Sequence, residues 1–362
     1  TVGDGNVAVG AFALDAEVTG HKTTAIGYSA LSAQANGSDI DALNTAVGYK
    51  AGTAITTGIE NTFLGAKAGD ALTVGDYNVA IGMDALGQPT TQDIQGVIAI
   101  GYQSMNGSSS TTTDVDFSIA IGYQASIAVT TGNNIAIGYR ALKEHTEGTR
   151  NLAIGYQAMF NTYDGSADDT RESDDNIAIG YQSMGGAWTD SDADDADMNE
   201  RNVAIGNYTM DAAMAGAVNN TAMGHSALTA LTTGDANTAV GYQAGLAIDA
   251  GAGNTAIGYQ ALIADDSYGR NTAVGYTALT AVNSSGEAGN NTAVGYQCGD
   301  GITTGVNNTG LGASCAFDID ADNQTAIGYG ATTASTGANT IMMGNSSMTD
   351  IYMGDDATAF SQ

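Results

Sequence analysis

The chain has little proline, few charges and no long hydrophobic run. Its 362 residues include one proline, Pro89, which argues against a rigid extended linker. Only 13% of the residues are charged, below the roughly 25% that is typical of globular proteins, so uncharged polar groups must supply much of the surface. No apolar stretch approaches the ~18 residues of a membrane span, and we therefore expect no membrane insertion of this segment.

Positive charge is the scarcest of all, with 9 Lys and Arg against 39 Asp and Glu and a net charge of −30. Such a field repels phosphate backbones and anionic lipid surfaces, so nucleic-acid binding is disfavoured. Self-repulsion is better tolerated where salt screens it, which fits a saline or calcium-containing exterior.

Motifs of catalysis are absent from the sequence as well. It contains no His-Glu-x-x-His, no Cys/His cluster and no Gly-x-x-x-x-Gly-Lys-Ser/Thr loop, and His21, His145 and His225 are scattered. The 50 glycines have no Gly-X-Y period, which excludes collagen. We expect no enzyme and no required cofactor.

What the chain does have is a repeat, an aliphatic residue followed by glycine, that occurs nineteen times. The commonest spacing between these glycines is 17 residues, and a fixed period of this size indicates stacked structural units. The repeat glycines are Gly10, Gly27, Gly48, Gly65, Gly82, Gly101, Gly122, Gly138, Gly155, Gly180, Gly206, Gly224, Gly241, Gly258, Gly275, Gly295, Gly312, Gly328 and Gly344.

Counting each repeat glycine as position 0, position −1 is Val, Ile, Leu or Met in every repeat, and position −2 is Ala in sixteen. Because side chains alternate along a strand, one face is small (−2 and 0) and the other large (−1 and +1). A coil of this length is expected to hold two strands of four or five residues and two turns. Since both faces are apolar, both should be covered, and identical chains around an axis would supply the second cover.

Two further positions predict ladders along the stack. Position −4 is Asn in fourteen repeats, and stacked Asn side chains can hydrogen-bond to one another. Position +1 is Tyr in twelve. These rings form either an exposed aromatic ladder for sugar stacking or packed rungs with only their hydroxyls in water, and regular recurrence favours packing.

Cys298 and Cys315, the two cysteines, both occupy position +3 of consecutive repeats. Stacking would place their Cα atoms about 4.8 Å apart, within reach of a disulfide. The alternative is that each is a small buried residue in the place of alanine, as Ser104 and Thr209 are in other repeats.

Aspartate-rich stretches suggest calcium, because alternating carboxylates can surround Ca²⁺. The candidate ligands lack the glycine and glutamate of an EF-hand, and solvated acidic turns are the simpler interpretation. They are Asp190, Asp192, Asp194, Asp318, Asp320 and Asp322.

Function more often lies on irregular loops than on a regular scaffold, which directs attention to the longest insertions, near 160–175 and 185–200. The second contains Trp188, the chain's single tryptophan. Trp188 is either an interface anchor or a cap on the coil.

The repeated phrase Asn-Thr-Ala-Val/Ile-Gly-Tyr-Gln-Ala-Leu, as in 237–244 or 254–262, resembles the head repeats of trimeric autotransporter adhesins and the longer-period repeats of bacteriophage tail fibres. The resemblance spans about residues 6–344. It implies a left-handed parallel β-roll in which three chains wind about one axis, on a virion or a cell surface, and bind a host-surface glycan or protein.

The segment after the repeats also carries a resemblance. Residues 339–356, Asn-Thr-Ile-Met-Met-Gly and onward, resemble the segment that precedes a self-cleaving intramolecular chaperone in tail fibres. We therefore divide the chain into a β-roll rod at 1–344 and a terminal segment at 345–362, and an end at Gln362 would suit a cleaved product.

The sequence as a whole predicts an all-β protein, a repetitive β-roll or β-solenoid of about nineteen coils, with two identical chains as partners. Its expected function is that of a structural, receptor-binding fibre. A bacterial adhesin head is the first alternative. A monomeric β-solenoid that acts as a polysaccharide enzyme or an ice-binding surface is the second.

Overall fold

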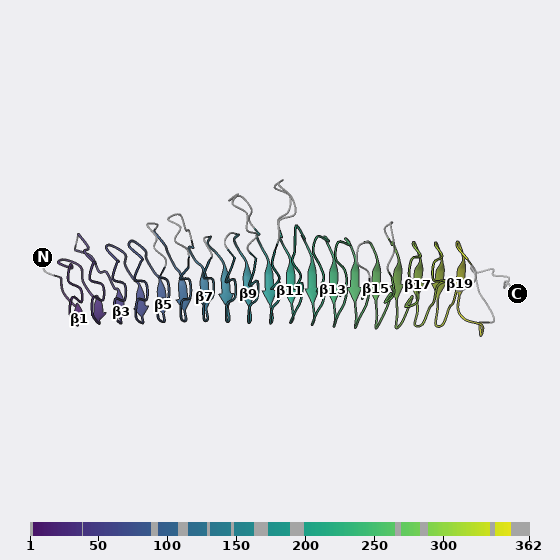
Figure 1. Cartoon of the computed structure of the whole chain (residues 1–362), viewed down its shortest axis with the longest axis horizontal. Coiled ribbons are helices and arrows are strands. Elements are labelled where there is room, and N and C mark those ends of the chain that lie inside the picture. Colours follow the sequence, from purple (N-terminus) through teal and green to yellow (C-terminus); the bar gives the residue numbers. More distant parts are fainter. Residues whose placement is uncertain are drawn as a thin grey trace, which may run out of the picture. The chain divides into compact units, whose positions relative to one another are not determined.

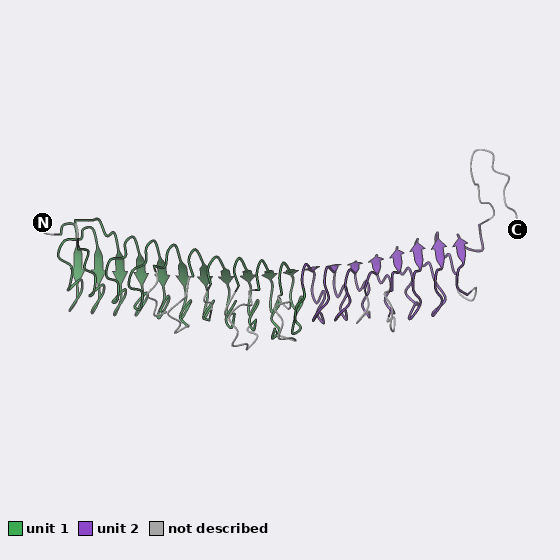
Figure 2. Cartoon of the chain, turned by 90° about the horizontal axis from the view of Figure 1, so that it is seen from above, with its two compact units in different colours: residues 1–217 green, residues 218–362 purple. Residues whose placement is uncertain are grey.

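The computed structural model describes residues 3–37, 39–87, 93–107, 115–128, 131–145, 148–162, 173–188, 199–264, 269–282, 289–333 and 337–348. Within these ranges the chain consists of short strands and turns, with no helix. The chain divides into two compact units, residues 1–217 and 218–362, which Figure 2 distinguishes by colour.

Each repeat of the described chain contributes one strand (Figure 1). The strands of the first unit are β1 (Val7–Val9), β2 (Thr24–Ile26), β3 (Thr45–Val47), β4 (Thr62–Leu64), β5 (Val79–Ile81), β6 (Ile98–Ile100), β7 (Ile119–Ile121), β8 (Ile135–Ile137), β9 (Leu152–Ile154), β10 (Ile177–Ile179) and β11 (Val203–Ile205). Those of the second are β12 (Thr221–Met223), β13 (Thr238–Val240), β14 (Thr255–Ile257), β15 (Thr272–Val274), β16 (Thr292–Val294), β17 (Thr309–Leu311), β18 (Thr325–Ile327) and β19 (Ile341–Met343).

Within each unit, consecutive strands pair in parallel and in the same register. Ala239 of β13, for example, lies opposite Ala222 of β12 on one side and Ala256 of β14 on the other. Every repeat position therefore stacks on its equivalent in the next coil. The prediction of an all-β solenoid with coils of about 17 residues is confirmed.

The expected strand length was wrong, because each strand has three residues and each described coil has one strand. The reason lies in the residues on either side. Leu43 and Glu60, one residue before the repeat Asn, have φ of 53° and 56°, so the chain turns just before the strand. Lys50 and Lys67, two residues after the repeat glycine, have φ of 56°, so it turns again just after it. Six residues lie between these two turns, and only the three before the repeat glycine, such as Thr45–Val47, pair as a strand.

The inner face of each coil is filled by small residues. From β2 onward, the central strand residue is fully buried wherever it is alanine, as at Ala46, Ala99 and Ala239. One coil replaces this alanine with Phe63, and the exchange is compensated by Gly52 and Gly69, where a Cβ atom would lie 2.7 and 2.4 Å from the Phe63 ring. The interior thus keeps its filled volume while its residues change, as close packing demands.

The repeat asparagines form the expected ladder inside the coil. Asn61 Nδ2 donates to Asn44 Oδ1 at 3.2 Å and to the Gly75 carbonyl at 2.6 Å. Its own Oδ1 accepts from the backbone N–H and the side-chain amide of Asn78, both at 3.0 Å. Because Asn61 is fully buried, these bonds satisfy polar groups that water cannot reach.

Candidate functional site

The outer face of the strands is the first candidate for a binding surface. The residues at positions −3 and −1 point away from the coil interior, and many of them are aliphatic and exposed in the single chain. Exposed members of this outer strand face are Val7, Val9, Ile26, Leu64, Met223, Ile257, Leu311, Ile327, Ile341 and Met343. Of the two faces expected to be covered, only the alanine face is covered by the chain itself. A recurrent apolar surface of this kind marks an interaction site.

The tyrosines at position +1 stack in long runs. From Tyr102 to Tyr181 in the first unit, successive ring centroids lie 4.9 to 5.3 Å apart with interplanar angles of 4° to 18°. From Tyr242 to Tyr296 in the second unit they lie 5.0 to 5.3 Å apart. Inside such a run both faces of each ring are occupied by neighbouring rings, so no face is free to stack on a sugar. These tyrosines pack against one another along the outside of the coil, but most of them are 37% to 52% exposed, so more of each side chain than its hydroxyl is in water.

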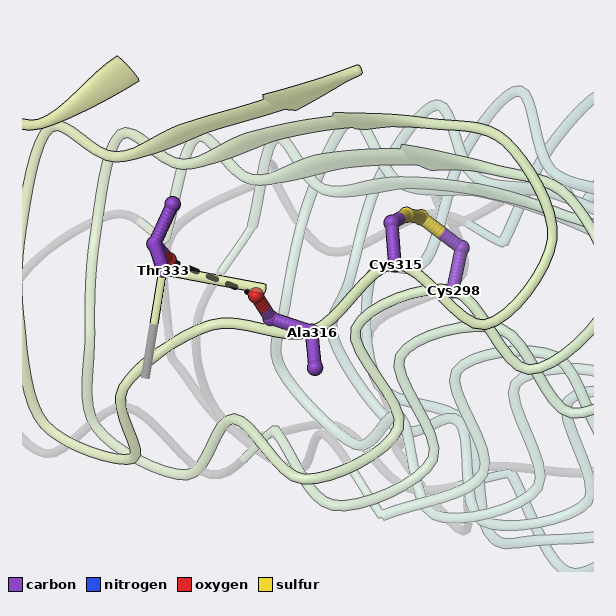
Figure 3. The surroundings of a disulfide bond; sticks show 4 residues. All are labelled: Cys298, Cys315, Ala316 and Thr333. Atoms are coloured by element: carbon purple, nitrogen blue, oxygen red, sulfur yellow. Dashed lines mark hydrogen bonds between the residues drawn. A yellow bond between two sulfur atoms is a disulfide. The ribbon is translucent and has the colours of Figure 1, made fainter. Parts of the chain in front are cut away.

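The two cysteines are joined by a disulfide (Figure 3). Their Cα atoms are 4.7 Å apart, and both side chains are fully buried. The neighbouring residue Gly310 takes the place of the usual alanine at position −2, and a Cβ atom there would lie 2.5 Å from Cys298 Sγ and 2.8 Å from Cys315 Sγ. The sequence therefore did contain a signal for the bridge, in the loss of one methyl group beside it.

We expect removal of this disulfide to lower stability. Closing a loop of 17 residues in the unfolded chain is worth about 3 kcal/mol in the chain-entropy account, so the double variant C298A/C315A should lose about that much. In chemical denaturation, the wild type treated with reductant should have nearly the same free energy of unfolding as the variant. An intact mass that does not change after reduction and alkylation would contradict the bridge.

Of the aspartates proposed to bind calcium, the three that the structure describes, Asp318, Asp320 and Asp322, do not form a metal-binding group. Asp320 accepts hydrogen bonds from the hydroxyls of Thr303 and Thr304 at 3.1 and 2.8 Å, and Asp322 accepts from the Val306 N–H at 2.9 Å. These carboxylates attach their turn to the preceding coil. The described ranges contain no group of three or more His, Cys, Asp or Glu side chains that could hold a metal ion, Asp318 included. Asp190, Asp192 and Asp194 lie outside the described residues.

Trp188 is buried rather than presented to solvent, with 3% of its surface exposed. Its backbone N–H donates to the Asn161 carbonyl at 3.0 Å, and its indole N–H has no partner in the described part of the chain. A buried ring cannot serve as an exposed interface anchor, so the capping interpretation fits better. Most of the two insertions near 160–175 and 185–200 lies outside the described ranges.

His145 is a buried titratable group, and no sequence pattern marked it as a candidate functional residue. Its Nδ1 shares a hydrogen bond with Thr162 Oγ1 at 2.8 Å, and its Nε2 faces Asn151 Nδ2 at 3.3 Å. An amide N–H beside Nε2 suits an unprotonated nitrogen and therefore a neutral ring. Burial of the imidazole lowers the pKa of His145 to about 4.

His145 should make the protein less stable in acid. Because its pKa is about 4 in the folded chain and 6.5 without that burial, the unfolded state binds the proton first as pH falls between these values. His145→Gln cannot take up that proton. The free energy of unfolding of the wild type relative to this variant should fall by on the order of 3 kcal/mol between pH 7 and pH 4. Asp211, whose pKa burial raises to about 6, acts in the opposite direction but is present in both proteins. A constant difference across this range would contradict the prediction.

The part of the chain that the structure describes contains no helix that could span a membrane. In comparisons with known proteins, no family model matches the chain and no curated protein does.

Proposed function

We propose that this chain is the rod of a receptor-binding fibre, of the kind found on phage tails and other surface filaments, and that three copies assemble side by side. The observation that carries the proposal is the outer strand face. The same aliphatic positions recur in coil after coil, and they are exposed or half-buried in the single chain while the alanine face is filled.

Three further features support a scaffold role. Runs of stacked asparagine amides and tyrosine rings connect neighbouring coils. The net charge of −30 favours a well-screened exterior and opposes nucleic-acid binding. Weak contacts made by three copies at once would combine through effective concentration, which suits attachment to a cell surface.

Light scattering on the purified chain tests the assembly. We expect three times the single-chain mass of 36.3 kDa. Ile257→Asp places a charge on the outer strand face and should reduce the mass to that of one chain. Ile319→Asp is the matched control, because Ile319 is an exposed aliphatic residue in a turn and not on a strand. A single-chain mass for the wild type would instead favour the monomeric solenoid.

Binding of the labelled rod to a panel of intact bacterial cells tests the attachment function. Saturable binding by the assembled wild type, weakened in the Ile257→Asp variant, is the expected result. Binding by neither protein to any cells tested would contradict the receptor-binding proposal.

A further inference from the structure

The tyrosine ladder of the second unit is interrupted at a single rung. Tyr296 is the last ring of the stacked run, the next repeat has Ala313 at position +1, and the repeat after that has Tyr329. Across the nineteen repeats, Ala313 is the one residue at this position that is not tyrosine and yet has a tyrosine in both neighbouring repeats. We call this place the Ala313 gap.

The backbone runs through the Ala313 gap without a break. The Ser314 N–H donates to the Tyr296 carbonyl at 2.7 Å, and the Gly330 N–H donates to the Ala313 carbonyl at 3.0 Å. The uninterrupted ladder has the same bond, from the Gln260 N–H to the Tyr242 carbonyl at 2.9 Å. Ala313 therefore stands in register between the two tyrosines, and one ring is missing from the stack.

The exposures of the flanking rings agree with this geometry. Tyr242 and Tyr259, inside the ladder, are 42% and 41% exposed, whereas Tyr296 is 52% and Tyr329 is 73% exposed. The side of Tyr296 that faces Ala313 has no stacked neighbour among the described rings, and Tyr329 has none either. Two aromatic faces thus stand on either side of a methyl group.

The separation of the flanking rungs limits what could lie between them. Two inter-strand steps give about 10 Å. A flat aromatic ring at van der Waals distance from both tyrosines would need only about 7 to 8 Å. A pyranose ring is puckered and carries C–H groups on both faces, so it needs more room and fits the larger spacing better.

Two residues that directly follow rungs of the Ala313 gap are polar and uncharged. Gln297 and Ser314 follow the first two rungs, and Ser314 is exposed. Their amide and hydroxyl groups can exchange hydrogen bonds with sugar hydroxyls, and neither would attract a charged ligand. The strongly negative chain further disfavours acidic sugars.

We propose that the Ala313 gap binds one neutral hexopyranose unit of a surface glycan, held between the rings of Tyr296 and Tyr329. This inference deepens the proposed function and rests on it for its biological meaning, since it names a receptor class and a place of contact. Ala313 lies in the turn that follows β17, so it is not one of the strand residues that define the outer strand face.

Saturation-transfer NMR on the full chain tests the site with three probes, the methyl glycosides of glucose, galactose and mannose. At least one should receive saturation from the wild type, with a Kd on the order of millimolar. Ala313→Tyr completes the ladder and should weaken that binding by at least about tenfold. Tyr329→Ala should weaken it similarly, whereas Tyr329→Phe keeps the ring and should retain it.

Ala66→Tyr is the matched control. Ala66 also occupies position +1 next to a tyrosine, Tyr49, but Met83 stands on its other side. The same chemical change there should leave glycoside binding unaltered. Circular dichroism of each variant checks that the coils are intact.

Three results would overturn the site. In the first, no glycoside receives saturation from the wild type. In the second, the wild type and Ala313→Tyr transfer saturation equally, and in the third only the flat probe p-cresol receives it. The cell-binding experiment distinguishes failure of the glycoside site from failure of the proposed receptor-binding function. An assembled rod that binds cells but no glycoside would retain the function and lose the site. Glycoside binding that depends on Ala313, in a rod that binds no cells, would retain the site and remove the function.

Discussion

Replacing Gly241 with alanine should unfold the coils on both sides of it and lower stability by about 3 kcal/mol or more. Gly241 has φ of 136°, a conformation that residues with a side chain rarely adopt. A Cβ atom there would lie 2.4 Å from the Gly258 carbonyl oxygen and 2.7 Å from its carbon. These are backbone atoms of the next coil, and the Gly258 N–H donates to the Val240 carbonyl at 2.8 Å. The clash cannot be relieved without opening the sheet.

Gly301→Ala is the matched control for this prediction. No atom would lie within 4 Å of a Cβ at Gly301, and this glycine is exposed. The free energy of unfolding of that variant should lie within about 0.5 kcal/mol of the wild-type value. Hydrogen exchange should show faster exchange in β13 and β14 for Gly241→Ala alone, because each coil contacts only its neighbours. Equal melting curves for the two variants would mean that coil spacing adapts easily.

Removing one interior asparagine should be about as damaging. Asn61→Ala deletes four side-chain hydrogen bonds and leaves the Gly75 carbonyl and the Asn78 backbone N–H buried without their partner. An unsatisfied buried group costs roughly 1–3 kcal/mol, so we expect a loss of about 4 kcal/mol in the free energy of unfolding. The exposed neighbour Thr62 supplies the control, and Thr62→Ala should change stability by about 0.5 kcal/mol.

Asn61→Asp separates hydrogen bonding from packing, because it keeps the shape of the side chain. Its carboxylate could still accept from Asn78, but an oxygen would replace the amide that donates to Gly75 and Asn44. We expect this variant to be at least as unstable as Asn61→Ala at neutral pH and to regain part of its stability in acid, where the carboxyl can donate. Urea denaturation at two pH values measures both. Wild-type stability in Asn61→Asp at neutral pH would show that the ladder contributes little.

The repeat allowed much of the fold to be predicted, since a fixed period with alanine on one strand face and asparagine at a constant offset admits stacked parallel coils. Strand length could not be predicted in the same way. It depends on left-handed backbone at residues such as Leu43, Glu60 and Lys67, and nothing in these residue types marks that conformation. The hydrogen bonds between coils impose it.

Among the candidate site residues, the environment of some could be predicted from the sequence and that of others could not. The spacing of Cys298 and Cys315 placed them within reach of a disulfide but did not choose between a bridge and two small buried residues, whereas the structure has the bridge and Gly310 leaves the space for it. Burial of Trp188 and His145 had no comparable signal, because neither residue type recurs at a fixed position of the repeat. The burial of a residue can be inferred when the same residue type recurs at one position of every repeat, and it cannot be inferred in this way for a residue outside the pattern.

The strict register of the strands has a consequence for how such a chain can change in length. Deleting residues 238–254 would join Asn237 to Thr255, and the strand after the junction would read Thr-Ala-Ile-Gly-Tyr-Gln, as β14 does now. Asn237 now meets Asn254 as its successor, and after the deletion it would meet Asn271 in the same place. Unequal recombination between repeats would therefore yield folded products whenever it removes or adds whole coils. The number of coils could therefore change one at a time during evolution, and no new core would have to evolve at each step.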